Sequence, residues 1–226
     1  RSFVASGIHV TDIGIVTTPV SYFAVTHFKC SGAVMITGSH NPPEYNGLKL
    51  VIGNNSVFGT EIQKLRNMIE TREFRSGSGS ESKAEIIPHY LNFLKDSFRF
   101  KRTLKVVVDS GNGTAGLVAP AALGNLGHDV IELFSEPDST FPNHHPDPTV
   151  EKNLQDLIRK VSETKADVGF AFDGDADRIG VVDERGVIVW GDKLLILFSR
   201  SILKDHPDAK FVADVKCSNL FFEDVQ

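Results

Sequence analysis

The sequence has few cysteines, no long apolar run and no excess of basic residues. Its two cysteines, Cys30 and Cys217, are far apart and form no Cys-x-x-Cys pair, so neither a disulfide framework nor a zinc site is indicated. The longest apolar stretch, Leu194–Phe198, is far shorter than the ~20 residues that span a bilayer, and no signal-peptide pattern opens the chain. We therefore expect a cytoplasmic protein that does not bind a membrane.

The charged residues are mixed in sign and give the chain a formal net charge of -5. Lys and Arg are scattered, so no basic field is available to hold a nucleic-acid backbone. The hydrophobic fraction of 41% and the charged fraction of 23% are ordinary for a globular protein. We expect a folded chain that has no nucleic-acid partner.

Short apolar segments alternate with segments of helical periodicity along most of the chain. Strands are expected at 13–16, 33–36, 104–108, 129–134, 167–172, 179–183 and 187–190. Helices are expected from Thr18 onward, at 60–69, 116–126 and 150–163, and from Asp192 onward as the first part of a new helix–strand unit. This alternation predicts successive α/β domains with mixed or parallel sheets.

A segment without apolar side chains, residues 76–83, has the composition of a flexible connector. We place the first boundary there and expect an α/β domain at 1–84, a second α/β domain at 85–187 and the start of a third at 188–226. The first of these begins in mid-pattern and the third stops early. The chain therefore has the pattern of a fragment that is cut at both ends.

A polar loop, Thr37–Pro43, follows the strand expected at 33–36. Ser39 would lie at the end of a rigid element, where functional side chains are often displayed. An ordinary polar turn before a proline would have the same composition. Ser39 by itself therefore identifies no chemistry.

Three carboxylates at alternate positions follow a buried strand. Asp173, Asp175 and Asp177 can converge on one hard cation, and oxygen ligands suit magnesium or calcium. A calcium EF-hand competes, because Glu184 occupies the twelfth position of such a loop. However, its sixth position is Arg178 where an EF-hand requires glycine, and strands flank the loop instead of helices. The segment predicts a magnesium site.

Two further features bear on phosphate chemistry. The guanidinium of Arg178, beside the carboxylates, can hold a phosphate in bidentate geometry or pair with the aspartates. The loop Gly111–Gly116 matches the G-x-G-x-x-G spacing of dinucleotide-binding proteins and has Glu132 about twenty residues further on. It would make the chain an oxidoreductase domain, although Asp109 places a carboxylate close to where a pyrophosphate would lie.

Two adjacent histidines, His144 and His145, lie in a proline-rich loop. Histidines in such loops more often form backbone hydrogen bonds than bind a metal. We assign no catalytic role to them.

The Ser39 loop and the aspartate loop, in this order, resemble those of the α-D-phosphohexomutase family, above all its bacterial phosphomannomutase/phosphoglucomutase members. The resemblance extends over essentially the whole chain, through Pro43–Lys49, Val108–Gly113, Phe141–Pro148 and Asp214–Cys217. It implies four domains around a central cleft, the first three of α/β architecture. The chain would hold most of the first, all of the second and the start of the third.

The resemblance implies an isomerase that transfers phosphate within a hexose phosphate, interconverting the 1- and 6-phosphates of glucose, mannose or both. Ser39 would carry a phosphate, give it to the free hydroxyl of the substrate and accept the other phosphate of the resulting hexose 1,6-bisphosphate, which also acts as activator. One Mg²⁺ would be held by Asp173, Asp175 and Asp177 together with an oxygen of the phosphoserine.

The same resemblance places His40 and Lys49 beside the transferred phosphate and implies a phosphate-binding role for Arg178. Lys49 is the candidate for proton transfer, provided that its surroundings lower its pKa. A phosphoserine carries about -1.5 to -2 charges and would repel a sugar phosphate without nearby cations. The expected partner is a hexose phosphate, and the expected state is a monomer.

Two departures from the family pattern concern residue 176 and the missing domains. Ala176 stands where many relatives have glycine, and the regions that would recognise the sugar and hold the non-reacting phosphate are absent from the sequence. Positioning supplies much of the catalysis in phosphoryl transfer. We therefore expect weak or no turnover from these 226 residues alone, and we keep dinucleotide binding at 111–116 as the alternative function.

Overall fold

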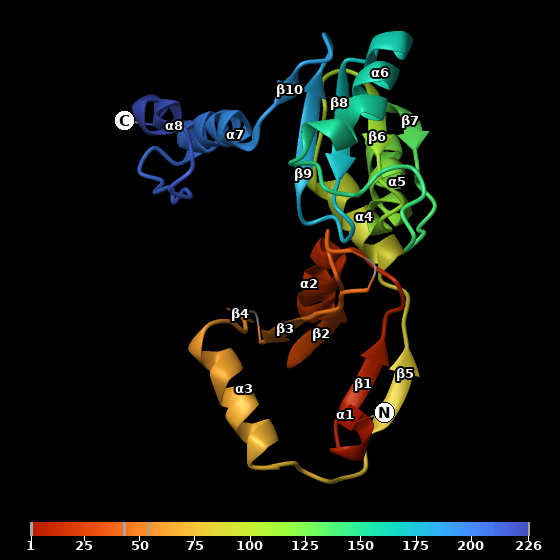
Figure 1. The fold of residues 1–226 in the computed structure, drawn as a ribbon, viewed down its shortest axis with the longest axis vertical. Coiled ribbons are helices and arrows are strands. Elements are labelled where there is room, and N and C mark those ends of the chain that lie inside the picture. Colours follow the sequence, from red (N-terminus) through yellow and green to blue (C-terminus); the bar gives the residue numbers. More distant parts are fainter. Residues whose placement is uncertain (1, 43, 54, 226) are drawn as a thin grey trace.

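The computed structural model describes residues 2–42, 44–53 and 55–225. Pro43 of the Ser39 loop, and positions 1 and 226 at the ends of the expected domains, lie outside the described residues. Figure 1 shows three groups of elements: the N-terminal strands and helices, a five-stranded sheet with its helices, and a C-terminal pair of helices. The predicted α/β architecture is confirmed.

The N-terminal group contains two small sheets. Strand β1 pairs in parallel with β5, whereas β3 pairs antiparallel with both β2 and β4. Three helices accompany these strands. In chain order the elements are α1 (Ser2–Ala5), β1 (His9–Asp12), α2 (Thr18–His27), β2 (Gly32–Ile36), β3 (Leu48–Ile52), β4 (Asn55–Ser56), α3 (Thr60–Glu70) and β5 (Ser80–Lys83).

Two expectations for this group are wrong. The strand expected at 13–16 lies earlier, at β1, because Gly14 has a φ of 71° and its N–H is bonded to the Asp12 carboxylate, a turn that ends the strand. The segment 76–83, expected to be a flexible connector, contains β5, whose Ser80 lies opposite His9 of β1. Backbone pairing needs no apolar side chains, so the composition concealed this exposed edge strand.

Helix α2 joins the N-terminal group to the second group. It begins after Thr17, whose side chain accepts a hydrogen bond from the Val20 N–H and caps the helix. Its buried face contributes Val20 and Ala24 to an apolar cluster that also contains Val118 of the second group. This packing positions the two groups against each other.

The second group is a five-stranded mixed sheet with the order β10-β9-β8-β6-β7. Strand β6 pairs in parallel with β7 and β8, β8 pairs antiparallel with β9, and a hairpin around Glu184–Gly186 joins the antiparallel strands β9 and β10. The elements are α4 (Ile87–Ser97), β6 (Lys105–Asp109), α5 (Ala119–Asn125), β7 (Asp129–Leu133), α6 (Gln155–Thr164), β8 (Val168–Phe172), β9 (Ile179–Asp183) and β10 (Ile188–Val189), with short 3₁₀ turns at 114–117 and 151–154.

The core of this group lies between the central strands and α6. Val107 and Val182 of the sheet pack with Leu154, Leu157 and Val161, and all five side chains are fully buried. Side chains on the β6 strand are buried on both faces, as expected for a parallel strand that is covered on both sides. The loops that follow β6 and β8 are therefore attached to well-packed strands.

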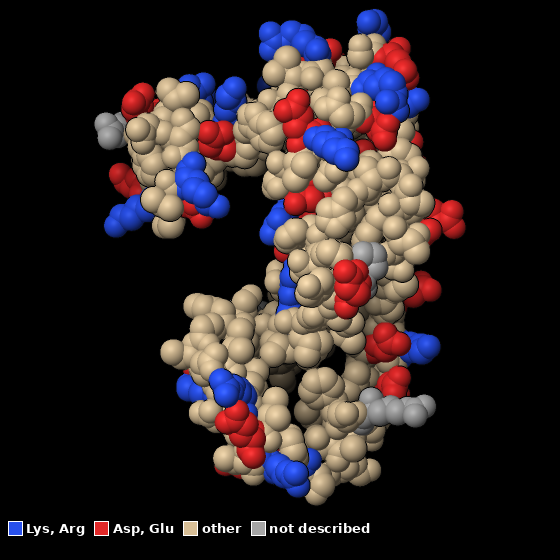
Figure 2. All heavy atoms as spheres, viewed as in Figure 1, with Lys and Arg blue, Asp and Glu red and all other residues tan. Residues whose placement is uncertain are grey.

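The C-terminal group consists of α7 (Gly191–Asp205) and α8 (Asn219–Asp224), which are linked by an ion pair between Arg200 and Asp224. The helix expected from Asp192 is confirmed, but no strand follows it among residues 206–225, the part of this group after α7 that the structure describes. Within the described ranges, no helix is long and apolar enough to cross a membrane. Figure 2 shows Lys, Arg, Asp and Glu interspersed over the visible face.

Candidate active site

Two loops that are far apart in the sequence meet where the first and second groups contact each other. The loop after β2 carries Ser39 and His40, and the loop after β8 carries the three aspartates. Lys49 reaches the same place from β3, where it lies opposite Met35 of β2. The structure thus brings together the residues that were predicted from separate motifs.

Ser39 lies directly against the carboxylates. Its Oγ donates to Asp173 Oδ2 at 2.6 Å and lies 3.1 Å from Asp175 Oδ1. Its backbone has a φ of 51°, in the left-handed region that is costly for a residue with a side chain. The Ser39 N–H donates to Thr37 Oγ1 at 2.8 Å, which helps to hold this conformation.

The three aspartates form a compact acidic cluster. Asp173, Asp175 and Asp177 each offer an oxygen, and these oxygens all lie within 4.8 Å of one another. Asp173 and Asp175 are buried, with 0% and 2% exposure, whereas Asp177 is exposed. Buried carboxylates this close together repel one another, and oxygen ligands of this kind suit a hard divalent cation.

The backbone and nearby hydroxyl groups fix the orientation of the two buried carboxylates. Asp173 Oδ1 accepts the N–H groups of Asp177 and Arg178, each at 3.0 Å. Asp175 Oδ2 accepts the hydroxyls of Thr18 at 3.0 Å and Thr37 at 2.9 Å. Both threonines were missed in the sequence, because no local pattern indicates a contact with a carboxylate more than a hundred residues away.

The electrostatic surroundings of the two buried acids differ. Burial raises the pKa of Asp173, and the charges of Asp175 and Asp177 add to this effect. Burial acts in the same direction on Asp175, but hydrogen bonds from Lys49 and Thr37 outweigh it and lower the pKa of Asp175. The cluster thus combines an acid that resists ionisation with one that favours it.

Lys49 bridges two members of the acidic cluster. Its Nζ donates to Asp175 Oδ2 and Asp177 Oδ2, both at 2.6 Å, and to Thr18 Oγ1 at 3.1 Å. Burial would lower the pKa of Lys49, but the hydrogen bonds and charges of the two carboxylates outweigh burial and raise it. In this arrangement the amine is a cation and a proton donor.

His40 and Arg178 form a chain of contacts that starts at Ser39. His40 Nδ1 is 3.3 Å from Ser39 Oγ, and His40 Nε2 is 3.4 Å from Arg178 Nη1. Asp147 lies nearby: burial would raise its pKa, but hydrogen bonds from Thr149 and the electrostatic influence of His40 and Arg178 lower it. The serine hydroxyl therefore lies between two carboxylates and His40, and Arg178 contacts the far nitrogen of the His40 ring.

The glycine loop at 111–116 packs against Gly174 of the aspartate loop. A Cβ on Gly113 would lie 2.8 Å from the Gly174 carbonyl oxygen, and the Thr114 N–H donates to that same oxygen at 2.9 Å. The Gly111 N–H is taken by the Asp109 carboxylate at 2.9 Å. These groups pack the protein itself and do not face an open phosphate site.

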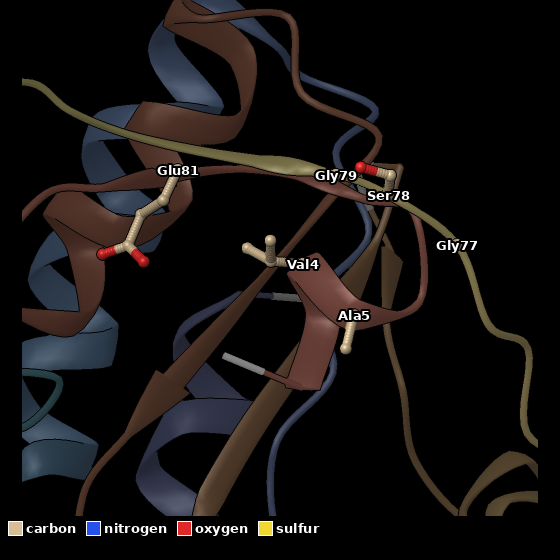
Figure 3. Close-up of a pocket in the computed structure, with 6 residues that line it drawn as sticks. All are labelled: Val4, Ala5, Gly77, Ser78, Gly79 and Glu81. Atoms are coloured by element: carbon tan, nitrogen blue, oxygen red, sulfur yellow. The ribbon is translucent and has the colours of Figure 1, made fainter.

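Two hollows among the described residues lie outside the carboxylate cluster itself, although Ala176 of the aspartate loop lines one of them. One, of about 290 Å³, lies between α1 and the chain around β5; Figure 3 shows Val4, Ala5 and Glu81 on its rim. The other, of about 330 Å³, is an apolar groove whose lining includes Tyr90 and Phe172. Each of the two hollows is lined by a single ionisable side chain, Glu81 in the first and Tyr90 in the second, so neither contains a cluster of such groups.

The comparisons with known proteins agree with this geometry. The family model "Phosphoglucomutase/phosphomannomutase, alpha/beta/alpha domain I" matches residues 1–76, and the model for domain II matches residues 88–186. A phosphomannomutase/phosphoglucomutase of Pseudomonas syringae pv. tomato is 49% identical over 94% of this chain and 46% of its own length. A phosphoglucomutase of Neisseria meningitidis serogroup B is 45% identical over 97% of this chain and 48% of its own.

The structural comparison gives the same result. A crystal structure of a phosphoglucomutase/phosphomannomutase family protein from Burkholderia thailandensis superposes with a TM-score of 0.91 at 40% identity, covering 98% of this chain and 50% of that one. The chain spans about half the length of the relatives it matches. The dinucleotide-binding interpretation of the glycine loop receives no support from these matches. The chain belongs to the α-D-phosphohexomutase family, whose members include the phosphoglucomutases and phosphomannomutases.

Proposed function

We propose that this chain carries the phosphate-transferring half of a hexose-phosphate mutase, which interconverts hexose 1-phosphate and hexose 6-phosphate through a phosphorylated Ser39. The observation that carries the proposal is the contact of Ser39 Oγ with Asp173 Oδ2 at 2.6 Å, inside a cluster of three carboxylates. The names of the relatives support glucose and mannose phosphates as substrates.

Asp173, Asp175 and Asp177 fit a divalent cation, and we propose that they hold one Mg²⁺ together with an oxygen of the phosphoserine. Their oxygens lie within 4.8 Å of one another, and the mutual repulsion of buried carboxylates favours a cation between them. Bound Mg²⁺ would neutralise charge on the transferred phosphate.

In the proposed reaction the phosphorus–Oγ bond of phosphoserine 39 breaks, and the bond electrons return to Oγ. A new phosphorus–oxygen bond forms to the free hydroxyl of the hexose phosphate, whose proton passes to a base. The hexose 1,6-bisphosphate then reorients, Oγ attacks its other phosphate, and the sugar oxygen whose bond to phosphorus breaks takes up the proton that the base had accepted. The net result is a monophosphate with its phosphate at the other position and a regenerated phosphoserine.

Lys49, His40 and Arg178 have separate roles in this scheme. The raised pKa of Lys49 keeps the amine protonated while the amine contacts Asp175 and Asp177. Lys49 could therefore accept a proton only if these carboxylates bound a metal ion in place of the amine. His40, 3.3 Å from Ser39 Oγ, contacts the transferred phosphate. Arg178 binds phosphate oxygens from the side of His40.

We also propose the domain division 1–84, 85–187 and 188–226, with the reactive serine in the first domain and the metal loop in the second. The chain spans about half the length of the relatives it matches, so we expect turnover by this chain alone to be weak or absent. Action as a monomer in the cytoplasm, with no nucleic acid or membrane as partner, stays a prediction.

The test of this function is a single-turnover experiment. The chain is mixed with an equimolar amount of glucose 1,6-bisphosphate and Mg²⁺, and the release of glucose monophosphate is followed by ³¹P NMR. We expect up to one equivalent of monophosphate for each protein molecule, no release from Ser39→Ala, and normal release from Ser78→Ala, which alters a serine far from the acidic cluster. Equal release from the unchanged protein and Ser39→Ala would contradict the proposal.

A further inference from the structure

The loop at 141–148 connects the core of the second group with the loop that carries Ser39. His145 Nε2 lies 2.6 Å from the backbone carbonyl oxygen of His40, a contact between residues that are 105 positions apart. A carbonyl only accepts hydrogen bonds, so Nε2 must carry the proton and donate it. The residue next to the reactive serine is therefore held by a side chain from the other group.

The preceding residue, His144, forms a buried ion pair and also contacts the His145 backbone. His144 Nε2 lies 3.0 Å from Asp109 Oδ2 at the end of β6, and Asp109 is 0% exposed. The other ring nitrogen of His144, Nδ1, lies 3.0 Å from the His145 carbonyl oxygen. The position of His145 is thus tied to β6 of the five-stranded sheet.

The His40 contact has a clear consequence because Ser39 adopts a costly backbone conformation. A residue with a side chain at a φ of 51° persists only where its surroundings require it. Several contacts hold this turn: the Asn41 N–H donates to the Gly38 carbonyl, Thr37 Oγ1 accepts the Ser39 N–H, Gly174 packs against the Ser39 carbonyl, and His145 donates to the His40 carbonyl. Of these, the contact from His145 depends on an exchangeable side-chain donor in the other group.

We infer that His145 is a positioning residue for phosphate transfer: its Nε2–H fixes the His40 carbonyl, and this keeps Ser39 Oγ aimed at the acidic cluster. The inference rests on the proposed function of Ser39. His145 has no contact with the aspartates in the described structure, so it acts through the Ser39–His40 turn. Aromatic packing of its ring against Phe141, with centroids 6.1 Å apart, orients the donor.

The charges around the same loop favour this arrangement. Asp147, two residues after His145, lies close enough to His40 and Arg178 for their charges to act on its carboxylate. The loop at 141–148 thus contacts the His40 backbone and places a carboxylate within electrostatic reach of Arg178. It links the position of the phosphate-carrying loop to the phosphate-binding side chains.

Two substitutions separate the donor from the packing of the ring. His145→Phe keeps an aromatic ring beside Phe141 and removes the donor, whereas His145→Gln places an amide N–H close to the position of Nε2. Each variant, with His206→Phe as an exposed-histidine control, is mixed with glucose 1,6-bisphosphate and Mg²⁺. The rate of phosphate incorporation at Ser39 is measured by quenched-flow mass spectrometry, and hydrogen–deuterium exchange is measured over residues 37–42.

We expect His145→Phe to slow phosphate incorporation on the order of 10²-fold, the loss that a misplacement of about 1 Å causes, while the urea unfolding midpoint stays close to that of the unchanged chain. Exchange over residues 37–42 should become faster. His145→Gln should recover most of the rate and the protection, and His206→Phe should match the unchanged protein. A structural defect alone would not be rescued by glutamine.

Equal rates and equal exchange in His145→Phe and the unchanged chain would overturn the inference, as would an equal loss in the phenylalanine and glutamine variants. Absence of phosphate on Ser39 in the unchanged chain would instead contradict the proposed function. In that case the exchange measurement alone decides whether His145 holds the Ser39–His40 turn.

Discussion

Ser39 Oγ donates a hydrogen bond to Asp173 Oδ2 at 2.6 Å, although 134 positions separate the two residues in the chain. The contact joins the loop after β2 to the loop after β8 and places a hydroxyl at the edge of a buried acidic cluster. A serine in this position can carry a phosphate next to a metal-bound carboxylate set.

The backbone strain at Ser39 can be measured by comparing two substitutions. Ser39→Ala and Ser39→Gly both remove the hydroxyl, but only glycine adopts a φ of 51° without a steric cost. We expect Ser39→Gly to be more stable than Ser39→Ala by about 1 kcal/mol in urea unfolding. Equal stabilities would show that the turn at Ser39 carries no strain.

Gly174 is expected to tolerate no side chain. A Cβ at this position would overlap the carbonyl oxygen of Ser39 and push the two loops apart. Gly174→Ala should therefore abolish most phosphate incorporation at Ser39 and weaken Mg²⁺ binding, as measured by calorimetry.

The control for this substitution is Gly124→Ala. Gly124 lies in α5, and the space that a Cβ would occupy there is open, so alanine should leave transfer unchanged and stabilise the helix by about 1 kcal/mol. Normal transfer in Gly174→Ala would show that the close approach of the two loops is not required.

Lys49 is expected to compete with a cation for the carboxylates. Its Nζ lies 2.6 Å from both Asp175 Oδ2 and Asp177 Oδ2, so a bound metal ion must displace or share these contacts. Lys49→Met should bind Mg²⁺ more tightly in calorimetric titration and yet transfer phosphate more slowly. Unchanged Mg²⁺ affinity in this variant would contradict the competition.

The ion pair between His144 and Asp109 predicts a pH dependence of stability. Burial would lower the pKa of His144, but the hydrogen bond and charge of Asp109 outweigh burial and raise it above the ordinary 6.5. The folded state thus binds the proton more tightly than the unfolded state, so the contribution is fully present below pH 6.5 and is lost as the pH rises through the raised pKa.

This dependence is measured by urea unfolding of the unchanged chain and of His144→Gln at a series of pH values that starts below 6.5 and extends above the raised pKa of His144. The glutamine retains a hydrogen-bond donor but cannot titrate. The difference in stability between the two proteins should shrink as the pH rises. A constant difference would show that the charge on His144 does not contribute.

The strands of the second group were predicted well because their apolar runs are bounded by clear turns. The aspartate loop was also predictable, since its carboxylates alternate directly after such a strand. β1 was misplaced because a turn at Gly14 interrupts the apolar run Ile13–Val16, and turn geometry decides where a strand ends. The exposed strand β5 carries no apolar pattern at all.

Long-range contacts in the site gave no sequence signal. Thr18 and Thr37 were not singled out as partners of Asp175, and His145 was expected only to form a backbone hydrogen bond. That expectation is confirmed, but its acceptor, the carbonyl of His40, depends on packing between two groups of elements. Periodicity and motif spacing report local structure and do not specify such pairings.

The most direct test of the central claim is peptide mass mapping after the chain has been incubated with glucose 1,6-bisphosphate and Mg²⁺. Our account predicts that the peptide containing Ser39 gains one phosphate, and that Asp175→Asn, which alters the acidic cluster and leaves the serine in place, strongly reduces this gain. A Ser39 peptide that stays unmodified in the intact protein, or a phosphate found on another residue, would contradict it.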